Sequence, residues 1–413
     1  MSDMFLLGRQ PILDREEKVF AYALMFRPAE SLQLHTLNDG SFPAGGVIID
    51  VLSDAGAHEL LGEGKGVINI GYDLLMNDAV TTLPANRIIL ELNENLPLTS
   101  GVIHRCRTLK ESGFTLALHN HLFSRELTEL YGTVDIVGID LNQTPSGWIK
   151  NSVQQFRRYP VRLLVDKVDT RDEFNQCRTM GFDLFQGFFF ASPTMTAKKK
   201  LNETASTLLR IALLIINDAG VESIVRTVQE SPALTYKLLL QANSAVVGAR
   251  QEIDSVRHAI LLLGRDQIRR WAQAELMVSN GSQEQDNPLV EMAMMRASFM
   301  EQFSKIHPKL RDSRDAADRA FLAGTLSTLE MIYNVSIENV VESVELSADV
   351  KKALLLREGL FGEMLMFVEA MERLDFHRVR RMLPKLNISP AQILDAQRKS
   401  FPRKAGGVGC SMI

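Results

Sequence analysis

Histidine, asparagine and aspartate side chains stand where chemistry could take place, at the ends of two short apolar runs between residues 113 and 141. The runs cover residues 115–118 and 134–139. His119, Asn120 and His121 follow the first run, and Asp140 follows the second. A helical-looking segment separates them, so the stretch predicts a strand, a helix and a second strand. An α/β barrel keeps its chemistry at such strand ends.

Other apolar runs in this half of the chain also end in acids or amides. These residues are Asn69, Glu91, Glu94, Asp166, Asp169 and Gln186. In a barrel they would converge on one mouth. Carboxylate and amide oxygens suit Mg²⁺ or Mn²⁺, and such metals activate water against a phosphodiester.

The elements that must position these residues are repeated strand and helix patterns. The candidate strands are residues 19–26, 66–70, 87–92, 114–118, 134–139, 161–165 and 184–190, and amphipathic stretches such as 44–59 and 101–111 lie between them. Repeated units of this kind imply a mainly parallel sheet covered by helices. About eight strands would close into a compact barrel. An open doubly wound sheet is the alternative, but no Gly-rich phosphate loop follows the first strand.

Residues 9–15, RQPILDR, followed by YALMFR at 22–27, resemble the opening of an EAL domain. Further segments that resemble the EAL family follow in the family's order. Together the similar segments span residues 5–193. The EAL family comprises cyclic-di-GMP phosphodiesterases that fold as a modified (β/α)8 barrel. The resemblance therefore implies that fold for this half of the chain.

The chain departs from the EAL pattern at its metal-binding positions. The family's signature Glu falls on Ala23, its Asp pair on His119-Asn120, and its Lys on Gly138. A methyl group cannot bind a metal, and a two-metal site needs several carboxylates. On this basis we predict no catalytic residues, no metal, no cofactor and no useful phosphodiesterase activity; the chain is predicted not to be an enzyme.

Six positions of the family pattern survive, and a Glu of the family is shortened to Asp166; these seven residues are predicted to form a vestigial ligand site. They are Gln10, Arg27, Asn69, Glu91, Asp140, Asp166 and Gln186. Arg27 could pair with a phosphate of cyclic di-GMP, while the two glutamines could form hydrogen bonds with the ligand. The same side chains could instead support the barrel. His119 and His121 with Glu91 could make a zinc-like set, or the histidines could simply lie on a loop.

After a polar stretch at residues 194–206 the pattern becomes helical almost throughout. Residues 231–244 and 253–264 resemble an HDOD domain, a helical output module related to HD-domain phosphohydrolases. The His-Asp metal positions of those enzymes fall on Ser327-Thr328. We predict four parts: a degenerate EAL-like barrel at 1–193, a linker at 194–206, a helical HDOD domain at 207–404 and a flexible tail at 405–413. The fold class is thus α/β followed by all-α.

Composition limits the classes of partner. The 413 residues carry a net charge of −4, with 46% apolar and 23% charged residues, and the three cysteines show no disulfide or metal spacing. This indicates a cytoplasmic globular protein with no large nucleic-acid or membrane surface.

The predicted function is that of a non-catalytic bacterial signalling protein that acts through protein partners, with a homo-oligomer possible. The resemblance implies outputs in motility, biofilm formation or virulence linked to cyclic di-GMP. The alternatives are a cyclic-di-GMP phosphodiesterase with an atypical metal site, and a receptor that binds cyclic di-GMP without hydrolysis.

Overall fold

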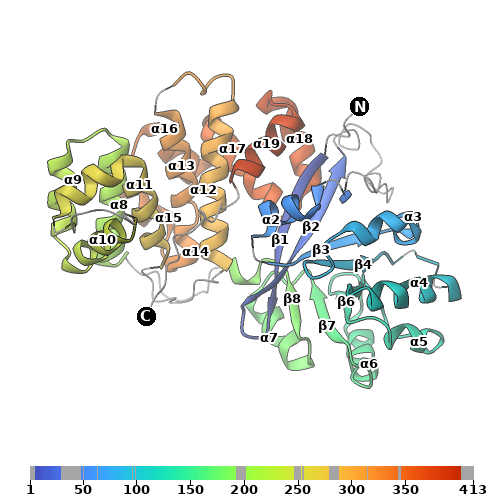
Figure 1. Cartoon of the computed structure of the whole chain (residues 1–413). Helices are drawn as coiled ribbons and strands as arrows, with labels where there is room; N and C mark the ends of the chain where they lie inside the picture. The colour runs from blue at the N-terminus through green and yellow to red at the C-terminus, as the bar shows by residue number, and fades with distance from the viewer. Residues whose placement is uncertain are drawn as a thin grey trace. The chain divides into compact units, whose positions relative to one another are not determined.

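The computed structural model divides the chain into two compact units (Figure 1). The barrel unit comprises Met1–Ser192 and Phe367–Phe401, and the helical unit comprises Pro193–Met366 and Pro402–Ile413. The structure describes residues 5–28, 48–49, 51–62, 64–94, 96–97, 99–191, 201–245, 253, 255–278, 288–313, 315–342 and 346–400. Each unit is described by itself.

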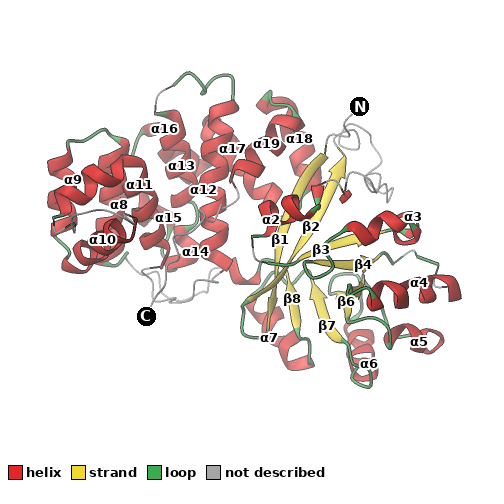
Figure 2. Ribbon diagram, in the orientation of Figure 1, coloured by secondary structure: helices red, strands yellow, loops and turns green. Residues whose placement is uncertain are grey.

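Eight strands close into a barrel in chain order (Figure 2). They are β1 (Phe5–Asp14), β2 (Val19–Pro28), β3 (Gly66–Ile70), β4 (Ile88–Leu92), β5 (Thr115–Leu118), β6 (Ile136–Asp140), β7 (Arg162–Asp166) and β8 (Leu184–Gln186). Strand β1 runs antiparallel to β2 and β8, and all other neighbours are parallel. The predicted barrel is confirmed, and the open sheet is excluded.

One layer of the barrel core consists of apolar side chains, and every strand contributes one residue to it. The layer consists of Ile12, Ala21, Val67, Ile89, Ala117, Ile136, Leu164 and Leu184, all buried. Side chains alternate between the two faces of a strand, so residues two positions away also point into the barrel. This layer therefore decides which residues reach the mouth.

Two details of the predicted strands are wrong. Residues 5–14 form β1, a strand the sequence did not indicate because Gly8 and Pro11 interrupt it. The last predicted strand stops at Gln186, and residues 189–191 form a 3-10 turn. Gly187 makes that stop, since its φ is 145° and a Cβ there would lie 2.0 Å from the Val168 carbonyl oxygen.

Short helices follow the strands of the barrel. They are α2 (Asp54–Leu61), α3 (Tyr72–Met76), α4 (Ser100–Glu111), α5 (Thr128–Tyr131), α6 (Ser146–Phe156) and α7 (Arg171–Met180), with 3-10 turns η1 (Asp78–Thr82), η2 (Arg125–Leu127) and η3 (Phe189–Ala191). Helix α7 begins at a capping box formed by Thr170 and Glu173 and ends at Gly181, whose φ is 108°. These caps satisfy the free amides and carbonyls at its two ends.

Helices α18 (Phe376–Leu386) and α19 (Pro390–Ser400) belong to the barrel unit. The Gln397 side chain donates to the Leu7 carbonyl at 2.8 Å. The Arg373 guanidinium lies 5.2 Å from the centre of the Phe188 ring. The predicted domains placed residues 207–404 together, whereas the compact units group 367–401 with the barrel.

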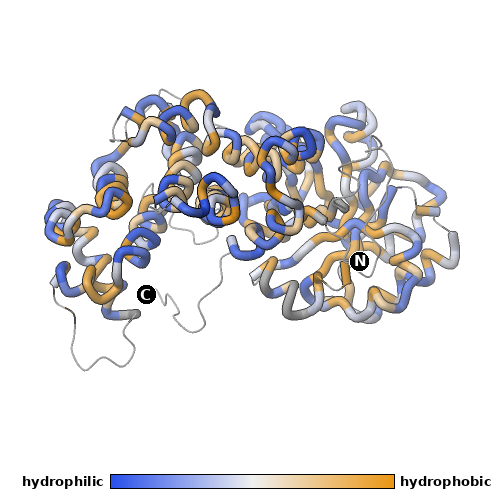
Figure 3. The backbone as a smooth tube through the Cα atoms, turned by 90° about the horizontal axis from the view of Figure 1, so that it is seen from above, coloured by the Kyte–Doolittle hydropathy of each residue, from blue (hydrophilic) through white to orange (hydrophobic). Residues whose placement is uncertain are grey.

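The helical unit holds the remaining described helices. They are α8 (Glu203–Ile216), α9 (Val221–Gln229), α10 (Pro232–Ala245), α11 (Val256–Val278), α12 (Pro288–Ile306), α13 (Ala316–Leu326), α14 (Leu329–Tyr333), α15 (Ile337–Glu342), α16 (Ala348–Leu356) and α17 (Gly359–Glu372), which extends past Met366 into the barrel unit. Blue and orange segments alternate along many of them in Figure 3, as in amphipathic helices. Among the described residues, no helix is long and apolar enough to cross a membrane.

Two boundaries of the helical half can be compared with the sequence. Helix α8 begins at Glu203, inside the predicted linker, and residues 405–413 lie outside the described part of the chain. Gly264 interrupts α11 with φ 75° and ψ 167°, which are not helical angles. The hydroxyl of Ser255 accepts from the His258 amide at 3.2 Å, as a helix cap does.

We predict that the contact between α12 and α13 depends on Gly324. A Cβ at this position would lie 2.7 Å from the Ala297 Cα, which is backbone and cannot move aside. Gly324→Ala should therefore lower the free energy of unfolding by about 1–3 kcal/mol in urea unfolding followed by circular dichroism.

Gly147 in α6 is the matched control, because nothing lies within 4 Å of its Cβ position. Gly147→Ala should raise the free energy of unfolding by about 0.5–1 kcal/mol, the ordinary helical preference for alanine. Equal effects of the two substitutions would contradict close packing at Gly324.

Candidate functional site

The residues that reach the barrel mouth lie two positions beyond the apolar layer on each strand. We call them the mouth layer: Gln10, Ala23, Asn69, Glu91, His119, Gly138, Asp166 and Gln186. Asp140 comes two residues after Gly138 at the end of β6. The register thus brings together most of the predicted ligand residues. Arg27 lies in β2 opposite Leu6, but its side chain is outside the described residues.

Glu91 is the centre of one polar group. Its Oε2 accepts from Asn69 Nδ2 at 3.1 Å and lies 3.2 Å from His119 Nδ1. Asn93 in turn donates to Asn69 Oδ1 at 3.1 Å. Burial pulls the pKa of His119 downward, but the hydrogen bond to Glu91 and the charges of Glu91, Asp166 and Glu94 outweigh it and raise that pKa to about 9. His119 is therefore a cation at neutral pH.

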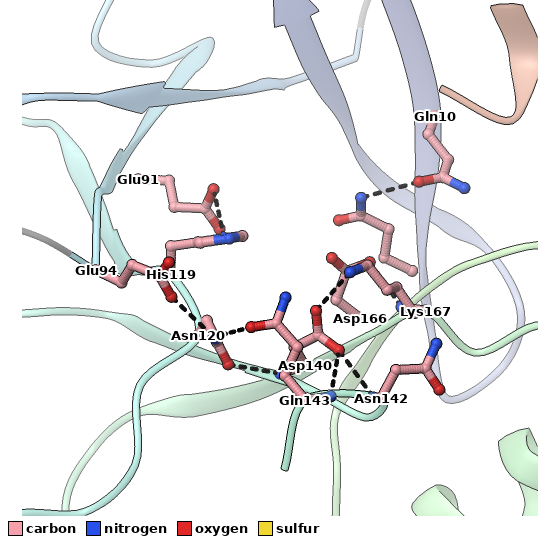
Figure 4. Close-up of polar contacts among 11 residues, drawn as sticks. Gln10, Glu91, Glu94, His119, Asn120, Asp140, Asn142, Gln143, Asp166 and Lys167 are labelled. Atoms are coloured by element: carbon pink, nitrogen blue, oxygen red, sulfur yellow. Dashed lines mark hydrogen bonds and ion pairs between the residues drawn. The ribbon is translucent and has the colours of Figure 1, made fainter. Parts of the chain in front are cut away.

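Asp140 is the centre of a second polar group (Figure 4). Its side chain is only 4% exposed, and its Oδ2 lies 2.7 Å from the ammonium of Lys167. Its Oδ1 accepts from the backbone amides of Asn142 and Gln143 at 2.8 and 3.1 Å. A buried carboxylate needs such partners, and here a lysine supplies the opposite charge.

Asp166 lies between these groups on β7. Burial raises its pKa, and the charges of Glu91 and Asp140 raise it further, while the Lys167 amide and His119 oppose the change. The resulting pKa is about 6. A carboxyl group with a pKa this close to neutrality can exchange a proton during catalysis.

Two further contacts complete the mouth. The Gln186 amide donates to Gln10 Oε1 at 2.9 Å. Asn120 takes a left-handed φ of 42°, and its side-chain amide donates to Glu94 at 2.8 Å and to Gln143 at 3.1 Å. These bonds join the loops after β4, β5 and β6.

The two histidines do not form a zinc-like pair. His119 points to Glu91, whereas His121 Nε2 lies 2.9 Å from the hydroxyl of the buried Tyr131. The left-handed conformation of Asn120 breaks the extended backbone, so alternate residues no longer share a face. Burial also lowers the pKa of His121.

The mouth as arranged does not fit a pair of divalent cations. Among the described residues, no three or more His, Cys, Asp or Glu side chains are placed to hold a metal. Glu91 is engaged with Asn69 and His119, and Asp140 with Lys167. We therefore derive no chemistry through metal ions at this site.

Ser327 and Thr328, the two positions that the sequence resemblance aligned with a His-Asp pair, carry hydroxyl side chains in the helical unit. Both side chains are buried, Ser327 at 7% and Thr328 at 0% exposed. Ser327 accepts from Arg296 at 3.1 Å, and Thr328 donates to the Thr325 carbonyl at 2.7 Å. These hydrogen bonds stabilise the turn between α13 and α14, so the two hydroxyl groups have a structural role.

Sequence reasoning missed Lys167, the cation nearest to Asp140. The available signal was a lysine directly between Asp166 and Val168 in a loop of acids. That Lys167 reaches Asp140 depends on the neighbouring positions of β6 and β7, where Asp140 pairs with Asp166 in register. A pairing between separate strands is not readable from local sequence.

Comparisons with known proteins address both halves of the chain. Residues 201–357 match the HDOD domain. The Vibrio cholerae protein CdgJ, named a cyclic di-GMP phosphodiesterase, is 27% identical over 403 residues, which is 95% of this chain and 92% of that protein. The uncharacterized Bacillus subtilis protein YuxH is 25% identical over 374 residues, covering 89% and 90%.

Solved structures of EAL proteins resemble the chain more distantly. A standalone EAL protein from Vibrio cholerae with bound c-di-GMP shares 19% identity, covers 46% of this chain and 93% of that chain, and has a TM-score of 0.37. The EAL domain protein YkuI of Bacillus subtilis, in complex with c-di-GMP and calcium, shares 18% identity, covers 65% and 73%, and also has a TM-score of 0.37.

The prediction that the chain is not an enzyme is contradicted by this comparison, since a relative matched over 95% of the chain is named a phosphodiesterase. That prediction assumed that a chain without the metal-binding residues of the EAL family has no phosphodiesterase activity. The mouth nevertheless holds Glu91, Asp140 and Asp166 beside two cations, Lys167 and His119. The negative charges of the mouth are balanced by the side chains of Lys167 and His119. A count of the missing metal ligands does not reveal this balance.

We predict that Asp166 destabilises the folded protein above about pH 6. Its pKa of about 6 in the folded protein exceeds the ordinary aspartate value of 3.8, so folding favours the protonated form. The charged form therefore lowers stability once the pH rises through that range. Asp166→Asn should raise the free energy of unfolding by about 1–2 kcal/mol near pH 7.5 and by nothing below about pH 4.

Urea unfolding at the two pH values measures this difference. Asp312→Asn is the control, because the Asp312 side chain is 87% exposed and its substitution should change the free energy of unfolding by less than about 0.5 kcal/mol. A stability gain at Asp166 that is equal at both pH values would contradict the raised pKa.

Proposed function

Given that this chain is an EAL–HDOD two-domain protein, we propose that its barrel mouth binds cyclic di-GMP and hydrolyses it through an atypical site. The observation that carries the proposal is the cluster of Glu91, Asp140 and Asp166 with His119 at the carboxyl ends of neighbouring strands. The activity named for CdgJ supports the same conclusion.

The proposed reaction is attack of water on one phosphodiester. The water oxygen bonds to phosphorus, the bond from phosphorus to the leaving ribose oxygen breaks, and the leaving oxygen takes up a proton. Asp166, with a pKa of about 6, is mostly ionised at neutral pH and accepts the proton of the water. His119, with a pKa of about 9, is protonated there and donates to the leaving oxygen.

The substrate carries two negative phosphodiesters, so its binding needs positive charge and hydrogen-bond donors. Lys167 is 46% exposed and His119 is 37% exposed, so both can face a ligand. The side-chain amides of Gln10 in β1 and Gln186 in β8 are linked by a hydrogen bond and offer further hydrogen bonds to the ligand.

We predict that the full-length protein converts cyclic di-GMP to the linear dinucleotide. His119→Ala and Asp166→Asn should each lower the rate about 10²–10⁴-fold, because each removes one proton-transfer group. Chromatographic separation of the product over time measures the rate, with and without Mn²⁺ and with a chelator.

His104→Ala is the control, because His104 lies on the exposed face of α4 and should not change the rate. If no product forms, calorimetry with cyclic di-GMP shows whether the protein still binds the nucleotide. Binding without any product would replace the hydrolysis with the receptor alternative, and the absence of both binding and product would overturn the proposal.

A second proposal concerns protein contact by the helical unit. Helix α10 exposes Tyr236 at 68% and Leu240 at 58%, which lie on one face because they are four residues apart. Helix α11 exposes Leu261 and Leu262 at 59% and 46%. Exposed apolar side chains such as Tyr236 and Leu240 on one helix face favour association with a second copy or another signalling protein. In this proposal the protein acts in the cytoplasm, and through that partner it regulates motility, biofilm formation or virulence.

We predict that Tyr236→Ser with Leu240→Ser weakens self-association in sedimentation experiments over a range of protein concentrations. The free energy of unfolding should change by less than about 0.5 kcal/mol, since both side chains are exposed. Leu355→Ser with Leu356→Ser on α16 is the matched control, with side chains 42% and 62% exposed. Unchanged association in the α10 variant would contradict self-contact through this face.

A further inference from the structure

Lys167 has an unusual backbone for a lysine at the barrel mouth. It follows the last residue of β7 and takes φ 61°, a left-handed conformation that side-chain-bearing residues rarely adopt. Its amide donates to Asp166 Oδ1 at 2.7 Å. The next residue, Val168, donates from its amide to the Gln186 carbonyl at 2.9 Å. These bonds hold the loop against the end of β8.

With the backbone in this conformation, the side chain of Lys167 forms an ion pair with Asp140. The ammonium lies 2.7 Å from Asp140 Oδ2, and the other oxygen of that carboxylate is bound by two backbone amides. Asp140 therefore has a full set of partners without any ion. Burial lowers the pKa of Lys167, but the hydrogen bond to Asp140 and the charges of Asp140, Asp166 and Asp169 outweigh it and raise the pKa.

We propose that the Lys167 ammonium takes the place of a divalent cation at Asp140, balancing that buried carboxylate, excluding a metal ion from it and presenting positive charge to a phosphate of the ligand. The part of this inference that concerns the phosphate rests on the proposed function. The exclusion of a metal ion concerns Asp140 and Lys167 alone.

The physical reason is competition for one carboxylate. A divalent cation would need Asp140 Oδ2 and would meet the ammonium that already lies on it, so two positive charges would repel at short range. The ammonium is also attached to the chain and cannot dissociate. Because the Lys167 side chain remains 46% exposed, its other N–H donors can reach a phosphate oxygen.

The first test is calorimetric titration of the full-length protein with Mn²⁺ in the absence of nucleotide. Lys167→Gly removes the ammonium and suits φ 61°. This variant should bind Mn²⁺ at least about ten-fold more tightly than the unchanged protein. Adding Asp140→Asn should abolish the gain, and Lys167→Arg should show no gain because it keeps the positive charge.

Lys167→Asn is a second variant for the case in which Lys167→Gly does not fold, since asparagine also tolerates the left-handed region. Circular dichroism checks the fold of each variant. The inference is overturned if the unchanged protein binds Mn²⁺ as tightly as the folded variants do, or if the gain survives Asp140→Asn.

The second test is binding of cyclic di-GMP in the presence of a chelator. The unchanged protein should bind, Lys167→Gly should bind at least about ten-fold more weakly, and Lys167→Arg should recover most of the affinity. Equal affinity of the glycine variant would overturn the phosphate contact. If the unchanged protein binds no nucleotide, the proposed function and the phosphate contact both fail, while the Mn²⁺ titration still decides the exclusion of metal from Asp140.

Discussion

The alternation of side chains in a closed barrel is the constraint on which the site depends. Eight apolar residues, one from each strand, pack together in one layer of the core, and this sets which residues point into the mouth two positions away on each strand. A shift of one residue in β4 would turn Glu91 outward and bring an apolar neighbour into the mouth. The packing that stabilises the barrel thus also places Glu91, His119 and Asp166.

Once these acids converge, their charges must be balanced within a partly buried mouth. His119 lies against Glu91, and Lys167 lies against Asp140. Asp166, by contrast, has a pKa that burial and the neighbouring acids raise to about 6. Two different responses to the same excess of negative charge therefore occur within one mouth, namely pairing with a cation and a shift of pKa.

The barrel, the helical second half and most of the mouth residues could be predicted from local sequence. Strand β1 was missed because Gly8 and Pro11 interrupt its pattern. Of the two alternatives for His119 and His121, a zinc-like set does not form, because Asn120 between them leaves the extended conformation. The sequence predicts helices within residues 367–401 but not the unit to which they belong. Their contacts, such as the hydrogen bond from Gln397 to Leu7, place them in the barrel unit.

The sequence by itself determined the barrel, because a strand with alternating or continuous apolar residues has few ways to bury them, and it identified Glu91, Asp140 and Asp166 as strand-end acids. It also located the departures at Ala23 and His119-Asn120. Only the tertiary structure decided how those acids are balanced. The contact of Lys167 with Asp140 joins residues 27 positions apart, and it depends on the register of two strands and on one left-handed backbone angle. Local residue types do not encode such a pairing, because it arises when separate elements close into one barrel.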